Sequence, residues 1–337
     1  MIRMMNLFNR SGQHQVLRPL CYGKLPLSKD FLKSRGGEAG RKFQDWLNHL
    51  DRIHGRPAVI SQTQRILFIP GEGKNYLTGT VWDSSDAGGV RHFPFALLFE
   101  PSRRFLDVHA DRPVHGNLAL WEGLEQEYPT LATAQSPEEF YQHLRGIQLA
   151  VNNLEPSEDV KSFEAKAADV PVKELAEAMF GLDFLEDWTR LLWRCRCLLT
   201  GNGCHCSGAR PAFGLRMPLA EGIPYPLQID AWLGFLTEQA GGQLPVPSII
   251  YPRESMKGPS SFSLVFRTLR DSDVSLLQEE IGNAEMTDVT APGPDTSVSG
   301  FTDFAAAVRI WSDDPRADLR MILPRTGQEC GGKPDTA

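Results

Sequence analysis

The sequence has no apolar run long enough to cross a bilayer. Its 337 residues are 41% hydrophobic, which is enough to bury a substantial core. No window approaches the roughly 20 consecutive apolar residues of a membrane-spanning helix. Residues 1–15 also lack the continuous hydrophobic segment of a secretory signal. The sequence therefore predicts a cytoplasmic protein without membrane insertion.

Long basic stretches are missing as well. The chain has 42 acidic and 35 basic residues, for a net charge of -7. Its arginines are scattered, and the groups at Arg103–Arg104 and Arg194–Arg196 are too short to follow a phosphate backbone. We therefore expect no nucleic-acid partner.

The common catalytic motifs are also missing. The chain has no G-x-S-x-G or H-E-x-x-H segment and no kinase signature. Pro70–Asn75 contains a Gly-Lys pair, but a Walker A loop needs glycine where Phe68 stands and serine or threonine where Asn75 stands. We interpret this segment as a hairpin turn. The sequence thus predicts a non-enzymatic protein that needs no cofactor.

Cysteine is scarce, with six in the chain, but most lie close together at Cys195, Cys197, Cys204 and Cys206. Three thiolates and one imidazole would suit tetrahedral zinc, and the best ligands here would be Cys197, Cys204, His205 and Cys206. The spacing argues against a site, because residues i and i+2 of a helix point to different faces. A zinc module or metal-dependent enzyme stays an alternative to reduced, structural thiols.

Two segments carry the most specific pattern. Cys21–Phe31 is typical of a strand that enters a tight turn, where Gly23 permits close backbone approach. We expect Ser28 to cap a short helix ahead of the apolar run that starts at Phe31, with a glycine-containing loop before the next helix. Ser84–Pro94 is a second loop, which follows a predicted helix and hairpin.

Together these segments resemble the TagF/ImpM family, accessory proteins of bacterial type VI secretion systems. The residues that match the first family motif are Tyr22, Gly23, Lys24, Pro26, Asp30 and Phe31. The residues that match the second are Asp86, Gly89, Arg91, Phe93 and Pro94. Val90 is a departure, because it separates the glycine and arginine that are adjacent in the family.

The resemblance implies a cytoplasmic regulator, in particular a repressor, that binds a forkhead-associated scaffold protein of the secretion system. A threonine kinase and phosphatase pathway would act alongside it. A structural subunit associated with the baseplate is a further alternative.

The charged residues of the two motifs are the candidates for partner contact: Lys24, Asp30, Asp86 and Arg91. The aromatic residues and Pro94 would support them by packing. Alternatively, Asp86 and Arg91 pair with each other or with Lys24 and Asp30, which would hold the two loops side by side.

The predicted fold is α+β, with a central, mostly antiparallel sheet flanked by helices on both faces. Short connections between the β-rich runs over 65–99 require hairpins rather than crossovers. The strands expected are Val16–Leu25, Arg65–Ile69, Tyr76–Trp82, His92–Glu100, Phe213–Met217, Ser248–Tyr251 and Phe262–Thr268. The helices expected are Arg41–Ile53, Asn117–Tyr128, Pro137–Gln148, a region that opens at Pro171 and continues to Leu199 with an interruption near Gly181, Leu227–Gln239 and Ser272–Ile281.

The expected organisation is one family unit between two less ordered ends. Its parts are a flexible leader (1–15), an N-terminal α/β region like that of TagF (16–150), an acidic linker (151–170), a C-terminal helical and β part (171–283), and a largely disordered tail (284–337) with a short helix at 301–311.

Overall fold

The computed structural model describes most of the predicted family unit. The described residues are 14–50, 59–60, 62–71, 73–152, 166–167, 169–200, 214–242, 244–253, 260–278, 286–289, 301–314 and 316–317. Nearly all of the predicted leader, most of the acidic linker and most of the predicted tail lie outside them. So do Cys204, His205 and Cys206 of the candidate zinc cluster.

The described residues form a nine-stranded sheet in the order β11-β8-β10-β9-β4-β5-β6-β2-β3. Its strands are β2 (Leu20–Gly23), β3 (Leu32–Lys33), β4 (Gln64–Phe68), β5 (Leu77–Trp82), β6 (Phe95–Phe99), β8 (Gly214–Leu219), β9 (Ser248–Pro252), β10 (Ser260–Val265) and β11 (Met286–Asp288). All neighbours are antiparallel except β11, which runs parallel to β8. A separate pair joins β1 (His14–Leu17) to β7 (Leu149–Asn152).

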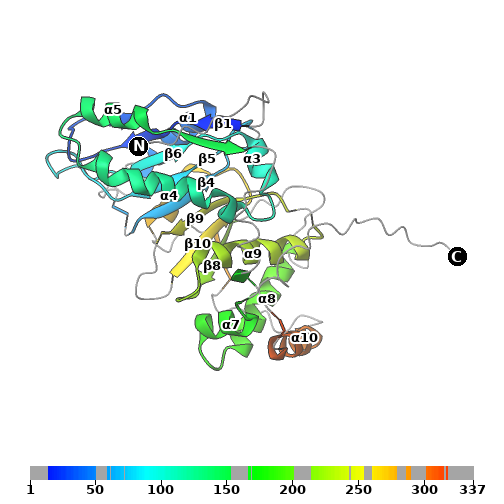
Figure 1. Ribbon diagram of the computed structural model, residues 1–337. Coiled ribbons are helices and arrows are strands. Elements are labelled where there is room, and N and C mark those ends of the chain that lie inside the picture. The colour runs from blue at the N-terminus through cyan, green and yellow to red at the C-terminus, as the bar shows by residue number, and fades with distance from the viewer. Residues whose placement is uncertain are drawn as a thin grey trace.

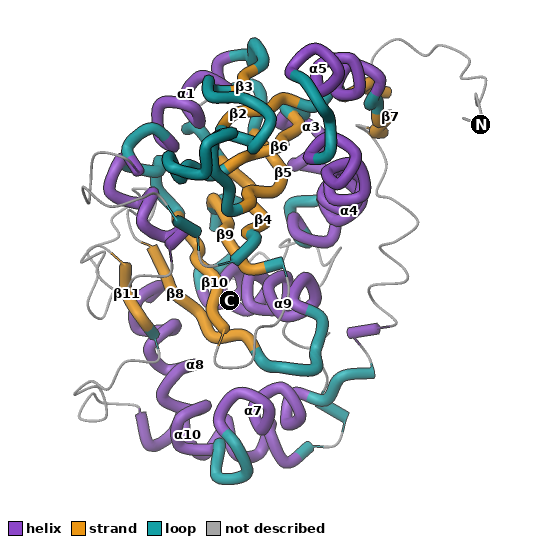
Figure 2. Tube along the Cα trace, turned by 90° about the vertical axis from the view of Figure 1, so that its left-hand side faces the viewer, coloured by secondary structure: helices purple, strands orange, loops and turns teal. Residues whose placement is uncertain are grey.

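Helices cover both faces of this sheet, as the sequence predicts. Figure 2 shows α1 on one side of the strands and α4 and α9 on the other. The helices are α1 (Glu38–Leu47), α3 (Arg103–Val108), α4 (Pro113–Ala132), α5 (Pro137–Gly146), α7 (Val172–Phe180), α8 (Leu185–Thr200), α9 (Tyr225–Gln239) and α10 (Phe301–Asp313), with a 3₁₀ helix, η1, over Asp271–Gln278. In Figure 1, α7, α8 and α10 lie together beyond the β8 end of the sheet.

Strand β4 shows how the sheet separates two hydrophobic cores. All five of its residues are buried. Ile66 and Phe68 pack in the core with α1, whereas Leu67 packs in the core with α4 and α9. Because side chains alternate between the faces of a strand, a central strand with apolar residues on both faces must be covered twice. The same holds for β6, whose five buried residues alternate between the two cores.

The N-terminal strand prediction is wrong in one respect, since Val16–Leu25 is two strands rather than one. Pro19 has no N–H for a ladder, and the chain changes sheet there: β1 pairs with β7 and β2 pairs with β6.

The predicted helix after Ser28 is also wrong. Ser28 Oγ accepts a hydrogen bond from Asp30 N at 3.0 Å, which forms a local turn. Leu32 then pairs with Gly23 as part of β3. The helix begins only at Glu38, and its residues Phe43, Trp46 and Leu47 are buried as their spacing predicts.

The C-terminal elements agree with the sequence in place but differ in detail. The segment predicted as an α-helix near Ser272 is 3₁₀, and β11 has no counterpart among the predicted strands. Nearer the N-terminus, Ser136 caps α5 by accepting a hydrogen bond from Glu139 N at 3.2 Å. Helix α10 packs on α8, where the Trp193 ring lies 5.1 Å from that of Phe304.

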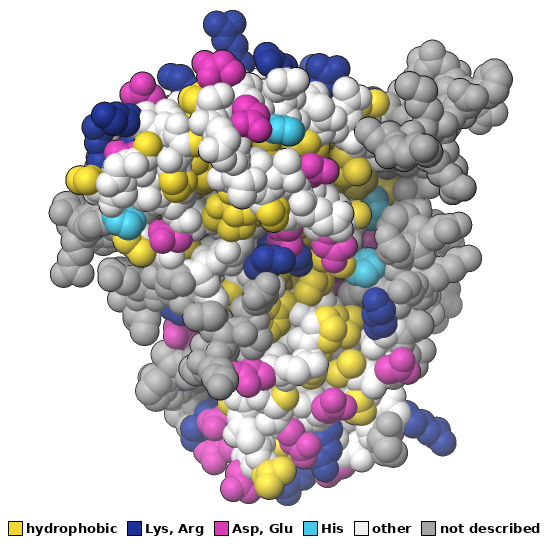
Figure 3. Space-filling view, turned by 60° about the vertical axis from the view of Figure 1, so that its left-hand side comes forward, with side chains coloured by type: hydrophobic (Ala, Val, Ile, Leu, Met, Phe, Trp, Pro, Cys, Tyr) yellow, Lys and Arg dark blue, Asp and Glu magenta, His cyan; other side chains and the backbone are white. Residues whose placement is uncertain are grey.

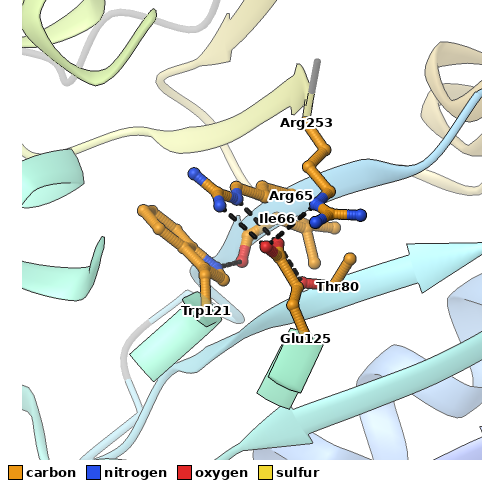
Figure 4. A network of polar contacts seen from close by, with 6 residues as sticks. All are labelled: Arg65, Ile66, Thr80, Trp121, Glu125 and Arg253. Atoms are coloured by element: carbon orange, nitrogen blue, oxygen red, sulfur yellow. Dashed lines mark hydrogen bonds and ion pairs between the residues drawn. The ribbon is translucent and has the colours of Figure 1, made fainter. Parts of the chain in front are cut away.

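A buried ionic network fixes α4 to the sheet (Figure 4). Arg65 of β4 donates two hydrogen bonds of 2.8 Å to the Glu125 carboxylate of α4. Arg253 adds a third at 3.0 Å and Thr80 a fourth at 3.2 Å. The Arg65 and Glu125 side chains are 10% and 6% exposed. Removing the carboxylate would therefore leave a guanidinium buried without its counter-charge.

The N-terminus of α4 is held by a buried acid from α9. Asp230 accepts hydrogen bonds from Val114 N at 3.0 Å and from His115 N at 2.8 Å. Burial raises the pKa of Asp230 to about 8, although the two N–H donors act in the opposite direction. This carboxyl joins two helices that lie far apart in the sequence.

We expect Glu125→Ala to lower the free energy of unfolding by about 3–5 kcal/mol, because it breaks a buried ion pair from one side. Urea denaturation measures this change. Glu127→Ala is the matched control, since Glu127 is exposed on the same helix and should change stability by less than about 0.5 kcal/mol. Equal losses in the two variants would contradict the role of the network.

Asp230 should make stability depend on pH in the direction opposite to that of most acids. The folded-state pKa of Asp230 is raised. The contribution of this carboxyl group to folding stability is therefore fully present below its unfolded-state pKa of about 3.9. That contribution is then lost as the pH rises through about 8. Relative to Asp230→Asn, wild-type stability should decline between pH 4 and pH 8. Asp107→Asn, at an exposed position on α3, should retain the wild-type profile, and parallel profiles for wild type and Asp230→Asn would contradict the assignment.

Candidate functional site

The two motifs form neighbouring loops at one end of the sheet. The first motif loop, residues 24–31, joins β2 to β3, and the second, residues 83–94, joins β5 to β6. Strands β2 and β6 are paired, with Tyr22 opposite Ala96. Ala87 N donates to Ser28 O at 3.0 Å, which links the loops directly. Motifs separated by a helix and a hairpin in sequence therefore make one surface.

Gly23 is required where the first motif loop begins and the second ends. Its φ of +135° is rare for residues with a side chain. A Cβ at this position would lie 2.0 Å from Pro94 O and 2.7 Å from Phe95 Cα. Only glycine lets the backbone of β2 approach the end of the second motif loop this closely.

Three aromatic rings pack beneath the loops. The Phe31 ring lies 5.6 Å from that of Tyr22 and 4.8 Å from that of Phe93, and the Tyr22 and Phe93 rings are 6.0 Å apart. The Tyr22 hydroxyl donates to Asn48 Oδ1, which connects this cluster to the end of α1. The aromatic motif residues thus form the support that the sequence predicts for them.

Lys24 is buried among these groups, with 3% of its surface exposed. Its Nζ donates to Lys29 O at 3.0 Å and lies 4.6 Å from the centre of the Phe31 ring. Both contacts stabilise a buried ammonium group. Lys24 therefore holds the first motif loop in shape and offers little surface for contact with a partner.

Asp86 organises the second motif loop. Its side chain is 5% exposed and its Oδ1 accepts N–H groups of Gly88 at 3.1 Å, Val90 at 3.2 Å and Arg91 at 3.4 Å. Burial raises the pKa of Asp86, but these three donors and the Lys24 charge outweigh it and hold the pKa below its usual range. Gly89, at φ +65°, completes the turn.

Other side chains of the two motif loops are exposed to solvent. Arg91 Nε lies 3.4 Å from Asp86 Oδ2, but the arginine side chain is 68% exposed. Val90 is 80% exposed, and Pro26 and Asp30 are also exposed. We call Pro26, Asp30, Val90 and Arg91 the loop-pair surface.

The charged candidates from the sequence thus form two groups: Lys24 and Asp86 are buried, whereas Asp30 and Arg91 are exposed. Asp86 and Arg91 pair with each other, which is the alternative that the sequence left open, while Lys24 bonds to a backbone carbonyl. Sequence reasoning missed the Ser28–Ala87 contact, because it joins backbone atoms and leaves no side-chain signal.

The cysteine cluster is described only in part. Cys195 is buried inside α8, and burial raises the pKa of its thiol to about 12. Cys21 is buried likewise, with a thiol pKa of about 12. Such thiols stay protonated at neutral pH. Cys197 is half-buried on a different side of the helix from Cys195. Within the described ranges, no three His, Cys, Asp or Glu side chains come together as a metal site.

Acidic and basic side chains are interspersed on the face shown in Figure 3, so neither sign of charge dominates there. None of the helices in the described part of the chain combines the length and hydropathy that a bilayer-spanning segment needs.

Comparison with known proteins finds little similarity. No protein-family model matches the chain, and no curated protein matches it. A crystal structure of PA0076 from Pseudomonas aeruginosa PAO1 is similar at 15% identity and a TM-score of 0.37, over 78% of this chain and 96% of that one. We draw no conclusion about fold or function from a similarity this low.

The lowered pKa of Asp86 predicts a loop that loosens in acid. The carboxylate stabilises the loop above its unfolded pKa of about 3.9, and the effect is lost as the pH falls through the lower, folded-state value. Amide hydrogen exchange at Gly88, Val90 and Arg91 should therefore accelerate in Asp86→Asn at neutral pH. Asp45→Asn on α1 is the control and should leave these amides protected. Unchanged exchange in Asp86→Asn would show that the carboxylate does not hold the loop.

Proposed function

We propose that this chain is a non-enzymatic, cytoplasmic accessory protein of type VI secretion that acts by binding another protein through the loop-pair surface. Two independent points support the proposal. The motif residues resemble those of the TagF/ImpM family. In addition, both motifs, far apart in sequence, contribute to one surface held together by Ala87 N and Ser28 O at 3.0 Å.

The observation that carries the proposal is the contrast between rigid support and exposed groups. Asp86 and Lys24 are buried and hydrogen-bonded to the loop backbone, and they lie with the buried rings of Tyr22 and Phe93 and the half-buried ring of Phe31. This support presents an arginine and a valine that are 68% and 80% exposed. A preorganised surface loses less conformational entropy on binding. Such an arrangement suits a recognition surface better than a purely structural turn.

The chemistry of the surface favours an acidic group on the partner. The Arg91 guanidinium can donate two parallel hydrogen bonds to a carboxylate or phosphate, and its 3.4 Å contact with Asp86 is long enough to be exchanged. Val90 supplies an adjacent apolar contact. The proposed partner is a forkhead-associated scaffold protein, whose assembly the chain would restrain.

Affinity capture tests the binding surface. Tagged wild-type protein should capture secretion-system components from its native cytoplasm, and Arg91→Glu should capture at least about tenfold less if one charged contact worth about 1.5–3 kcal/mol is lost. Arg309→Glu is the matched charge-reversal control, since Arg309 is exposed on α10. Capture of the same components by all three proteins would place the interface elsewhere.

Gene deletion tests the direction of the effect. Loss of a repressor should raise secretion of a type VI substrate, and complementation with Arg91→Glu should leave it raised. Loss of a structural subunit of the baseplate should abolish secretion instead, which would contradict the regulatory role.

A further inference from the structure

A pocket of about 260 Å³ lies at the opposite end of the sheet from the motif loops. It opens beyond the ends of three neighbouring strands, where Ile69 follows β4, Ser248 begins β9 and Phe266 follows β10. Because β4 and β5 are antiparallel and β5 leads into the second motif loop, this pocket and that loop lie at opposite ends of the strands.

Apolar side chains make up half of the ten residues that line the pocket. They are Ile69, Pro245, Val246, Val265 and Phe266. A pocket with apolar walls and a few directed polar groups is the usual form of a small-molecule site. Its size is below that of sites for drug-sized ligands, which span roughly 300–1,000 Å³, so it fits a compact ligand.

The two arginines that line the pocket have different surroundings. Arg267 is neutralised by Asp273, since its NH2 donates to Asp273 Oδ1 at 2.8 Å and its NH1 contacts the other oxygen. Arg103 is half-buried and donates through NH1 to Gly71 O at 3.2 Å. Among the described residues, no carboxylate lies within ion-pair distance of Arg103. The pocket therefore holds a cation whose charge is not balanced by those residues.

The polar side of the pocket is rigidly built. Gly71 has φ +94°, and a Cβ there would lie 3.3 Å from Thr268 Oγ1, so glycine suits both the turn and the approach. Ile69 N donates to the buried Ser248 Oγ at 2.9 Å. Arg103 N donates to Lys74 O at 2.8 Å, which ties the start of α3 to the β4–β5 hairpin. Gly71, in the turn that is not a Walker A loop in sequence, thus lines the pocket together with Arg103.

We propose that this pocket binds a small monocarboxylate with a hydrocarbon body, and that Arg103 pairs with the carboxylate. The guanidinium supplies the planar donor fork that a carboxylate fits, and the apolar walls accept the rest of the molecule. This site is separate from the loop-pair surface and does not depend on the proposed role in secretion.

Titration of the full chain with phenylacetate tests the proposal, with phenylacetamide as the neutral isostere. Binding followed by calorimetry or amide chemical shifts should favour phenylacetate. Arg103→Gln should weaken phenylacetate binding by about tenfold or more, the fold-change expected from losing a charged hydrogen bond. Arg104→Gln is the matched control, because Arg104 is exposed on the same helix and does not line the pocket. Circular dichroism of each variant confirms that it is folded.

Three results would overturn the proposal. They are equal binding of phenylacetate and phenylacetamide, unchanged binding in Arg103→Gln, and absence of phenylacetate binding in the millimolar range. A fourth would be binding of a peptide with a C-terminal phenylalanine carboxylate but not of phenylacetate, which would make the pocket a site for a protein terminus instead. Capture of secretion components by Arg103→Gln is expected to match wild type, so failure of this proposal is distinguishable from failure of the loop-pair surface.

Discussion

The pairing of β4 with β9 is the constraint on which the rest of the structure depends. It joins the strands of the N-terminal half to those of the C-terminal half, placing Ile66 opposite Ile250. Each face of β4 contributes to a different core, so the helices of both halves must cover the same sheet. Burial of Arg65 on this strand then requires the Glu125 carboxylate of α4, because an unpaired charge at that depth is costly.

This central pairing also determines where the chain can carry function. Antiparallel strands bring their connections to the two ends of the sheet. The motif loops lie at one end and the Arg103 pocket at the other, which separates the proposed binding surface from the proposed ligand site. Loops on a rigid sheet can change their exposed residues without disturbing the core. Val90, exposed at the tip of the second motif loop, is accommodated in this way.

The charged groups of the motif loops act mainly on their own backbone. Asp86 accepts three N–H groups, and Lys24 donates to a carbonyl. Buried polar groups need such partners, and here they turn flexible loops into a fixed surface. Arg91 differs because its guanidinium is exposed and its contact with Asp86 is long, at 3.4 Å. A change at Asp86 is therefore expected to act through loop shape, whereas a change at Arg91 acts on the surface itself.

The sequence by itself determined the α+β class, the β4–β5 hairpin, the amphipathic face of α1 and the aromatic support of the motifs, because periodicity and turn residues are local signals. It did not predict that Leu32 returns as β3, since a two-residue strand depends on Gly23 as its neighbour. Only the tertiary structure decided that Lys24 is buried, that Asp86 pairs with Arg91 and that Arg103 faces a pocket. The burial of Lys24 and the position of Arg103 depend on approaches between distant segments, such as Gly23 against Pro94, which leave no pattern in a single sequence. The Asp86–Arg91 pair lies within one loop and depends on the folded shape of that loop.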